Sequence, residues 1–557
     1  MTLMLNDPAP PADTEVGRTP ESAVAPPAEL RTREPQTVAA PHRDQAIDLI
    51  RFGCLIVVVI LHSMMSAAVL GPEGTVAPTV ALSTTAGFAA ASWFFQIMPL
   101  FFIIGGYAGI TGWRRTRARG GTWTDYLRAR LRRLAVPTAV LVVIAGIGLS
   151  AAADMGVSSE LIVEASRRIG QPLWFLAVYL GLSSLVPVAV HFHERAPRRS
   201  LAVLAGAVIV VDVLTRMTGV TGLGYLNFLF VWPLVQQLGF FFADASDRPI
   251  SRPVVWSALA AALGLLGGLV GAGVYSPNML VNLNPPTGAL VLLGVAQLCV
   301  LQLFHARLNR ALTVDRLSAE STTVPGEAPE SPNEAAPTSR ILTAQLWERV
   351  IAWGNTYGMQ VYLWHMSVVI VLIGALGWLA QTVVGFPTGI LLDLPTGTVA
   401  EFILPEIESG WWWATRLPWL LAVMGLSALV AMAAERIPFP SERRLAAVGR
   451  SLSALVRAVL PQGSPVQSSS RRARAVVAVG AATMGIAIAL LVGIAPMIWT
   501  VVVAGLLMGS LILSAGLGPN RGGEPGHGPA PDADAAPDAD AVPGADTAPD
   551  AGLTPLR

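Results

Sequence analysis

Residues 47–70 read IDLIRFGCLIVVVILHSMMSAAVL, and this stretch decides the class of the protein. It carries Asp48 and Arg51 near its start and one histidine, His62, inside an otherwise apolar run. Because a bilayer core of about 30 Å needs roughly 20 apolar residues in helical form, the stretch predicts a membrane-spanning helix over Ile47–Leu70.

The spacing of Arg51 and His62 places both side chains on one face of that helix. His62 follows Arg51 by 11 positions, which is about 20° beyond three full turns and about 16 Å along the axis. An ionisable side chain at membrane depth is costly and therefore suggests a functional site. Two structural roles are the alternatives to a functional site. Arg51 pairs with Asp48 or reaches lipid phosphates, and His62 forms a hydrogen bond with a neighbouring helix.

The composition extends this interpretation to the whole chain. Of 557 residues, 53% are hydrophobic and 13% are charged, whereas soluble domains are about 25% charged. We therefore predict an all-α, polytopic helical membrane protein with about ten core transmembrane helices plus a C-terminal two-helix hairpin. The net charge of +1 gives no reason to expect a nucleic-acid partner, and two cysteines in apolar runs, Cys54 and Cys299, predict no disulfide framework.

The distribution of arginine orients the predicted spans. Arginines are dense from Arg114 to Arg133, and the positive-inside rule makes this segment cytoplasmic. Both termini are then cytoplasmic, in a protein of the plasma membrane. One predicted outer loop, Asp154–Ile169, departs from the rule because it contains Arg167 and Arg168. Besides the first span, we predict spans at 87–112, 134–152, 172–190, 201–216, 223–243, 254–275, 286–304, 349–378 and 413–433, and a hairpin at 475–492 and 495–514.

Composition also divides the chain into segments. Tails rich in proline and alanine predict disorder, and arginine-rich connections predict cytoplasmic linkers. We expect a disordered cytoplasmic tail over 1–42, a transmembrane domain over 43–435 with a flexible cytoplasmic loop at 318–340, a basic cytoplasmic linker over 436–474, an extra transmembrane hairpin over 475–514 and a disordered tail over 515–557.

Three further motifs stand out against the apolar background. Arg130 and Arg133 precede the third span and form a guanidinium pair suited to phosphate, although the positive-inside rule alone also explains them. Gly105-Gly106-Tyr107 lets a helix or ligand approach the second span closely, and packing is the commoner reason.

Tyr362 and His365 form the last motif, three residues apart on one helical face. His365 lies at a depth similar to His62, so the two histidines line one cavity or are separate buried polar groups. No cysteine or histidine spacing typical of a metal site accompanies them. We therefore predict no metal and no tightly bound cofactor.

Together these motifs resemble the membrane-bound acyltransferase 3 family, in the style of its actinobacterial members, over roughly residues 43–435. The family's first helix is similar to Asp48-x-x-Arg51 followed by His62, and its FF-x-x-[SG]-G-[FY] motif is similar to Phe101–Tyr107. Its R-x-x-R before a proline, its tryptophan motif and its late Tyr-Leu-x-His resemble Arg130–Pro137, Pro172–Leu176 (PLWFL, with Trp174) and Tyr362–His365.

The resemblance implies an integral-membrane O-acyltransferase of the cell envelope, transferring groups other than amino-acyl groups. The expected donor is cytoplasmic acyl-CoA, by default acetyl-CoA, and the acceptor is a hydroxyl of a carbohydrate, glycolipid or other molecule. Arg130 and Arg133 would bind the CoA phosphates, and His62 would be the general base or a transient acyl carrier. Arg51 and His365 would complete the catalytic group. The supporting residues would be Asp48, Gly105, Gly106, Tyr107, Trp174 and Tyr362.

Two departures from the family pattern and one alternative function remain. The tryptophan motif continues as WFLAVYL without the glutamate that many members have, and no extracytoplasmic hydrolase-like domain is appended. The alternative is a transporter, exporter or non-catalytic scaffold built on a similar helical bundle, although the internal repeats typical of transporters are not visible. Membrane lipids are the remaining expected partners. The sequence does not indicate whether the protein is a monomer or an oligomer.

Overall fold

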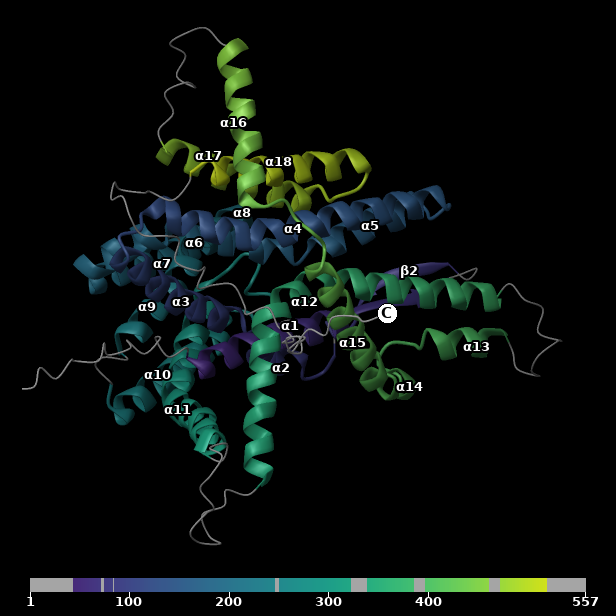
Figure 1. The fold of residues 1–557 in the computed structure, drawn as a ribbon. Helices are drawn as coiled ribbons and strands as arrows, with labels where there is room; N and C mark the ends of the chain where they lie inside the picture. Colours follow the sequence, from purple (N-terminus) through teal and green to yellow (C-terminus); the bar gives the residue numbers. More distant parts are fainter. Residues whose placement is uncertain are drawn as a thin grey trace, which may run out of the picture. The chain divides into compact units, whose positions relative to one another are not determined.

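The structure, a computed structural model, describes residues 44–71, 75–83, 85–245, 250–321, 338–384, 396–459 and 471–517. Within these residues the chain consists of helices and one two-stranded sheet (Figure 1). The elements are α1 (Gln45–Met65), β1 (Ser66–Leu70), β2 (Val76–Val80), α2 (Phe88–Phe95), α3 (Met98–Ala118), α4 (Trp123–Asp154), α5 (Ser159–Gly170), α6 (Leu173–Arg195), α7 (Pro197–Thr218), α8 (Thr221–Gly224), the 3-10 helix η2 (Tyr225–Leu229), α9 (Val231–Ala245), α10 (Arg252–Gly271), α11 (Gly288–Ser321), α12 (Thr338–Val384), α13 (Thr396–Ile403), α14 (Gly410–Ala414), α15 (Arg416–Glu435), α16 (Glu442–Val459), α17 (Arg471–Leu491) and α18 (Met497–Ala515).

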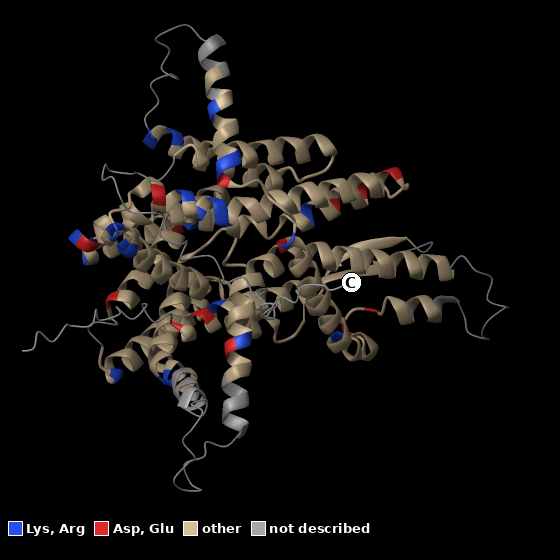
Figure 2. Cartoon of the chain, viewed as in Figure 1, with Lys and Arg blue, Asp and Glu red and all other residues tan. Residues whose placement is uncertain are grey.

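Twelve helical segments of the described residues are long and apolar enough to cross a membrane. They correspond to the ten predicted core spans and the two helices of the predicted hairpin, so the all-α polytopic fold is confirmed. The helices carry few charges along most of their length, and arginines gather along the first half of α4 (Figure 2). The tails predicted over 1–42 and beyond residue 517, and most of the loop predicted at 318–340, lie outside the described residues.

The first predicted span is too long. α1 ends at Met65, and Ser66–Leu70 form a strand that pairs antiparallel with Val76–Val80. The Met65 carbonyl accepts a hydrogen bond from the Ala81 amide at 2.8 Å, which satisfies one of the carbonyls left open at a helix end. A short apolar run fits a helix or a strand equally well, so the sequence alone extends the helix. His62 therefore lies in the last turn of α1.

The second predicted span is interrupted at Gln96, between α2 and α3. The Gln96 side chain donates to the Met279 carbonyl at 3.2 Å, and the Gln297 side chain donates to the Gln96 carbonyl at 2.8 Å. Gln96 is 1% exposed, so these bonds satisfy backbone that would otherwise be unpaired inside the protein. Pro99 fits directly after the interruption because a helix tolerates proline in its first turn.

α3 and α9 cross where two glycines face each other. A Cβ at Gly106 would overlap the Gln236 carbonyl, and a Cβ at Gly239 would overlap the Ile103 carbonyl. Only residues without side chains allow backbones to approach this closely. The glycine motif of the second span therefore serves helix packing here.

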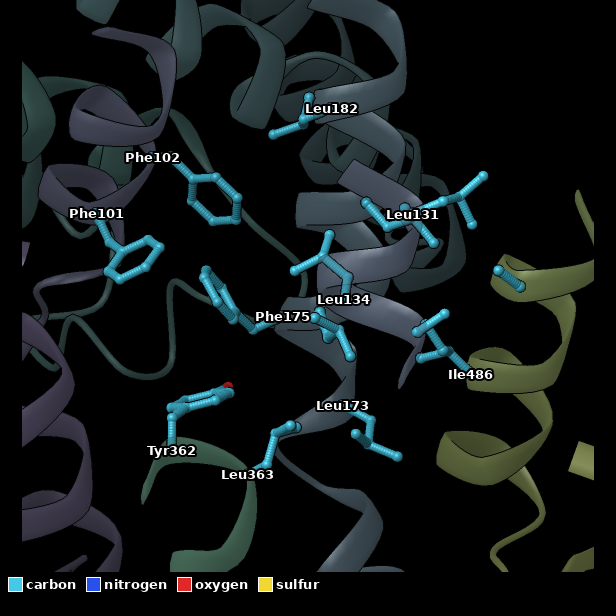
Figure 3. Close-up of a cluster of buried hydrophobic side chains, with 14 of the residues drawn as sticks. Phe101, Phe102, Leu131, Leu134, Leu173, Phe175, Leu182, Tyr362, Leu363 and Ile486 are labelled. Carbon is cyan, nitrogen blue, oxygen red and sulfur yellow. The ribbon is translucent and has the colours of Figure 1, made fainter. Parts of the chain in front are cut away.

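The largest buried cluster joins helices from distant parts of the chain. Figure 3 shows aromatic rings from α3, α6 and α12 facing one another, with leucines of α4 and α6 and an isoleucine of α17 beside them. The residues in this view include Phe101, Phe102, Leu134, Leu173, Phe175, Tyr362 and Ile486. The C-terminal hairpin thus contributes to the same apolar core as the earlier spans.

Two segments predicted as connections are helical. The predicted outer loop at 154–169 contains α5, where Glu164 forms ion pairs with Arg168 at 2.6 Å and Arg167 at 3.9 Å. Glu164 thus balances part of the positive charge of Arg167 and Arg168, and the outer position of this segment stays a prediction. The predicted linker at 436–474 contains α16, and its first residue, Glu442, pairs with Arg132 of α4 at 3.4 Å.

α12 packs closely against α1 through two further glycines. A Cβ at Gly354 would lie 2.6 Å from Cγ of Phe52, and a Cβ at Gly358 would lie 3.2 Å from a methyl group of Leu55. The two glycines are four residues apart and so occupy one face of α12, as in small-xxx-small packing motifs. This contact brings polar residues of the two helices within hydrogen-bonding distance.

We expect Gly354→Ala to lower the Tm of the purified protein in lipid nanodiscs. The new methyl group overlaps the Phe52 ring, and such overpacking costs about 1–3 kcal/mol. Gly374→Ala is the matched control on the same helix, because open space surrounds Gly374. Alanine is the better helix former, so this control should keep or raise the Tm. Equal Tm values for the two variants would contradict the close contact.

Candidate active site

The polar residues at the start of α1 bond to α12. Arg51 donates from Nη2 to Oδ1 of Asn355 at 2.6 Å, and Asn355 donates from Nδ2 to Oδ2 of Asp48 at 3.1 Å. Arg51 also lies 3.5 Å from Oδ1 of Asp48. Asp48 is 7% exposed, so the three side chains form a largely buried, charge-balanced triangle.

His62 bonds to a second residue of α12. Its Nδ1 lies 2.8 Å from Nε2 of His365, and the two imidazole planes differ by 7°. His365 is fully buried, and its Nδ1 lies 2.6 Å from the carbonyl oxygen of Tyr362. Both ring nitrogens of His365 are thereby engaged, and His62 contributes its Nδ1 to the pair.

Arg51 and His62 face the same neighbouring helix, but they do not meet. Arg51 contacts Asn355, whereas His62 contacts His365, ten residues further along α12. α1 and α12 therefore run in the same direction across this contact. Arg51 and His62 thus make two separate contacts, about 16 Å apart along α1, and their assignment to one catalytic group stays a prediction. The alternative in which Arg51 pairs with Asp48 is the arrangement present.

Tyr362 links the histidine pair to the tryptophan motif. Its hydroxyl donates to the Pro172 carbonyl at 2.8 Å, and its ring packs edge-on against Phe175 with centroids 5.4 Å apart. Trp174 in turn contacts Phe175 and Trp232. Two sequence motifs 190 residues apart therefore meet beside His365.

Trp419 of α15 was not singled out by the sequence. Its indole nitrogen donates to the Ser63 carbonyl at 3.0 Å, directly after His62. The guanidinium of Arg416 lies 4.2 Å from the Trp412 ring centroid and 5.8 Å from that of Trp419. The density of tryptophan in GWWWATRLPW was the available signal, but tryptophan at a membrane interface is ordinary.

The two arginines predicted to bind phosphate lie on α4. Arg130 donates to the Ala108 carbonyl at 3.4 Å and lies over the Tyr126 ring at 5.2 Å, which places it against α3. Arg133 is exposed. These positions are compatible with a ligand at the arginine-rich end of α4, where Arg130 contacts α3 and a tyrosine of its own helix.

The remaining predicted supporting residues serve packing. A Cβ at Gly105 would lie 3.0 Å from the Tyr179 ring, and the Tyr107 ring lies 5.5 Å from that of Phe242.

Both cysteines are buried and unpaired. The described part of the chain contains no group of three or more histidine, cysteine or acidic side chains suited to a metal.

Comparison with family models gives a match to an acyltransferase domain, Acyl_transf_3, over residues 44–436. The chain belongs to the acyltransferase 3 family. Searches of curated proteins and of solved structures found no match. The matched region runs from α1 to the end of α15 and so contains the Asp48–Arg51–Asn355 triangle and the histidine pair. This family member is therefore a multi-pass membrane acyltransferase.

We expect Asn355→Ala to destabilise the protein by about 1–3 kcal/mol, because it leaves Arg51 and Asp48 without their buried partner. Denaturant unfolding in detergent measures the change. Thr356→Ala is the control, because the Thr356 hydroxyl is exposed and bonds to its own helix at Ala352. If the two variants unfold alike, the triangle contributes nothing to stability.

Proposed function

We propose that the protein transfers an acyl group, by default acetyl, from cytoplasmic acyl-CoA to a hydroxyl of a carbohydrate, glycolipid or related acceptor. The proposed general base is His62. The observation that carries this proposal is the bonded pair of His62 and His365, with His365 bound in turn to the Tyr362 carbonyl.

The hydrogen bonds of His365 define which nitrogen of His62 can act as a base. A carbonyl oxygen only accepts, so Nδ1 of His365 carries a hydrogen that it donates to Tyr362. In the neutral ring Nε2 of His365 then has a lone pair and accepts from Nδ1–H of His62. The lone pair of His62 is consequently on Nε2. This assignment supports His62 Nε2 as the proton acceptor and His365 as its positioning residue.

In the proposed reaction, the lone pair on Nε2 of His62 accepts one proton in each catalytic cycle. Nε2 of His62 takes the proton of the acceptor hydroxyl as its oxygen attacks the thioester carbonyl carbon. The new C–O bond forms, the C–S bond breaks, and the CoA sulfur leaves with the electron pair and receives the proton. An imidazole is suited to both proton transfers because a ring nitrogen can accept a proton and then donate it again.

The other predicted residues take different roles in this proposal. Arg130 and Arg133 bind CoA phosphates at the arginine-rich end of α4, since guanidinium groups bind phosphate oxygens in pairs. Arg51, which the family resemblance places in the catalytic group, positions α12 through Asn355, because it contacts Asn355 and Asp48. The arginine-rich end is then cytoplasmic, and the acyl group moves toward His62.

His62→Ala should lower acyl transfer about 10²–10⁴-fold, the usual contribution of a general base. His365→Ala should lower it less, because the base remains but loses its orientation. The measurement is mass spectrometry of ester groups on envelope glycans and lipids, in cells with and without the protein. His191→Ala is the control, since His191 is exposed and distant in sequence from both histidines. Unchanged esters in the absence of the protein would favour the transporter or scaffold.

A second measurement separates a base from an acyl carrier. Purified protein incubated with radiolabelled acetyl-CoA, without an acceptor, should gain no covalent label if His62 only moves protons. A label that appears on the wild type and is absent from His62→Ala would instead assign His62 as the carrier. His365→Ala serves in this experiment to exclude labelling of the second ring.

A further inference from the structure

The C-terminal hairpin, α17 and α18, lies outside the family match but inside the packed core. The match ends at residue 436, and α17 begins at Arg471. One face of α17 is fully buried and consists mainly of small residues, and Figure 3 places Ile486 of this face near Leu134 and Leu173. These residues are Ala475, Ala478, Ala482, Gly485, Ile486 and Ala489. Small side chains at this spacing allow close helix contacts.

The turn of the hairpin is bonded to α5. The hydroxyl oxygen of Ser166 accepts hydrogen bonds from the amides of Ile494 at 2.8 Å and Ala495 at 3.1 Å. Ser166 is 2% exposed, so without this acceptor two amides near the protein interior would lose their partner. Thr500 fixes the turn from the other side by donating to the Ile494 carbonyl at 2.5 Å.

The same hairpin contacts the last residue of α5. A Cβ at Gly170 would lie 2.6 Å from the Ala489 carbonyl, so only glycine fits there. Two residues later, the Pro172 carbonyl accepts the hydroxyl of Tyr362. Residues 166–172, which we term the elbow, are therefore held by the hairpin on one side and hold α12 on the other.

The elbow ends next to the histidine pair. Tyr362 bonds to Pro172 through its hydroxyl and to His365 through its carbonyl. Displacement of the elbow would thus move the turn of α12 that orients the His365 ring. The shift needed is small, since misplacement of a catalytic group by about 1 Å can cost about 10²-fold in rate.

We propose that the C-terminal hairpin positions His365 through the elbow, with Ser166 as the positioning residue that fixes the contact. This proposal rests on the proposed function, because it assigns a role in supporting the general base. The hairpin then contributes to the activity of this chain's transferase domain and is not a separate module. It provides a support for the elbow that the family-matched region alone lacks.

The test measures CoA release from acetyl-CoA in isolated membranes that contain the full-length protein. Ser166→Ala should lower kcat about tenfold and leave the KM for acetyl-CoA unchanged, because the donor contacts lie elsewhere. Tyr362→Phe should act in the same way, since it removes the bond at the other end of the elbow. The double variant should lose little more than either single variant, because both changes interrupt one connection.

Ser514→Ala is the matched control. Ser514 is buried in the same hairpin at 2% exposure, but its hydroxyl donates to Leu511 of its own helix and not to α5. It should leave kcat unchanged, and its combination with Tyr362→Phe should be additive. Wild-type kcat in Ser166→Ala, or additive losses in Ser166→Ala with Tyr362→Phe, would overturn the proposal.

Hydrogen exchange tests the connection without any activity. In nanodiscs, the peptide that contains Tyr362 and His365 should exchange faster in Ser166→Ala than in the wild type or in Ser514→Ala. Equal exchange in the three proteins would overturn the proposal even where transfer is measurable. Faster exchange in Ser166→Ala, together with an absence of CoA release from every variant including the wild type, would support the connection and count against the proposed function alone.

Discussion

The close approach of α1 and α12 is the constraint on which the candidate site depends. Phe52 and Leu55 lie against Gly354 and Gly358, and a Cβ at Gly354 would overlap the Phe52 ring. At that spacing polar side chains of the two helices meet, and two sets of hydrogen bonds form, one at Asn355, between the two glycines, and one at His365, beyond them. Lipid offers no hydrophobic force to join apolar helices, so packing and these bonds carry the association.

The two sets of bonds differ in chemical character. Asp48, Arg51 and Asn355 satisfy one another's charge and donors, which suits a structural role at low exposure. In their neutral form His62 and His365 each carry one N–H and one lone pair, and their chain of hydrogen bonds ends at the Tyr362 carbonyl. At the Arg51 end of the α1–α12 contact the charges are therefore balanced. At the His62 end, one ring nitrogen remains that can accept and release a proton.

The sequence predicts the spans well because apolar length and arginine distribution are local properties. It also predicts that His62 and His365 lie at similar depth, since depth follows from distance to a helix end. It does not predict the partner of Arg51, because Asn355 is one polar residue among many and lies 304 positions away. The interruption at Gln96 was missed for the same reason: its hydrogen-bond partners, Met279 and Gln297, lie 183 and 201 residues later in the chain.

The end of α1 has a consequence for how the second half of α12 is covered. α1 stops at Met65, three residues beyond His62, and the chain turns into a two-stranded ribbon. Less than one helical turn therefore separates the imidazole from the end of its helix. The neighbouring α12 continues for 19 residues beyond His365, to Val384, and Val76 of the ribbon lies against its Gly377. The ribbon therefore covers part of the α12 surface that a longer α1 would have covered.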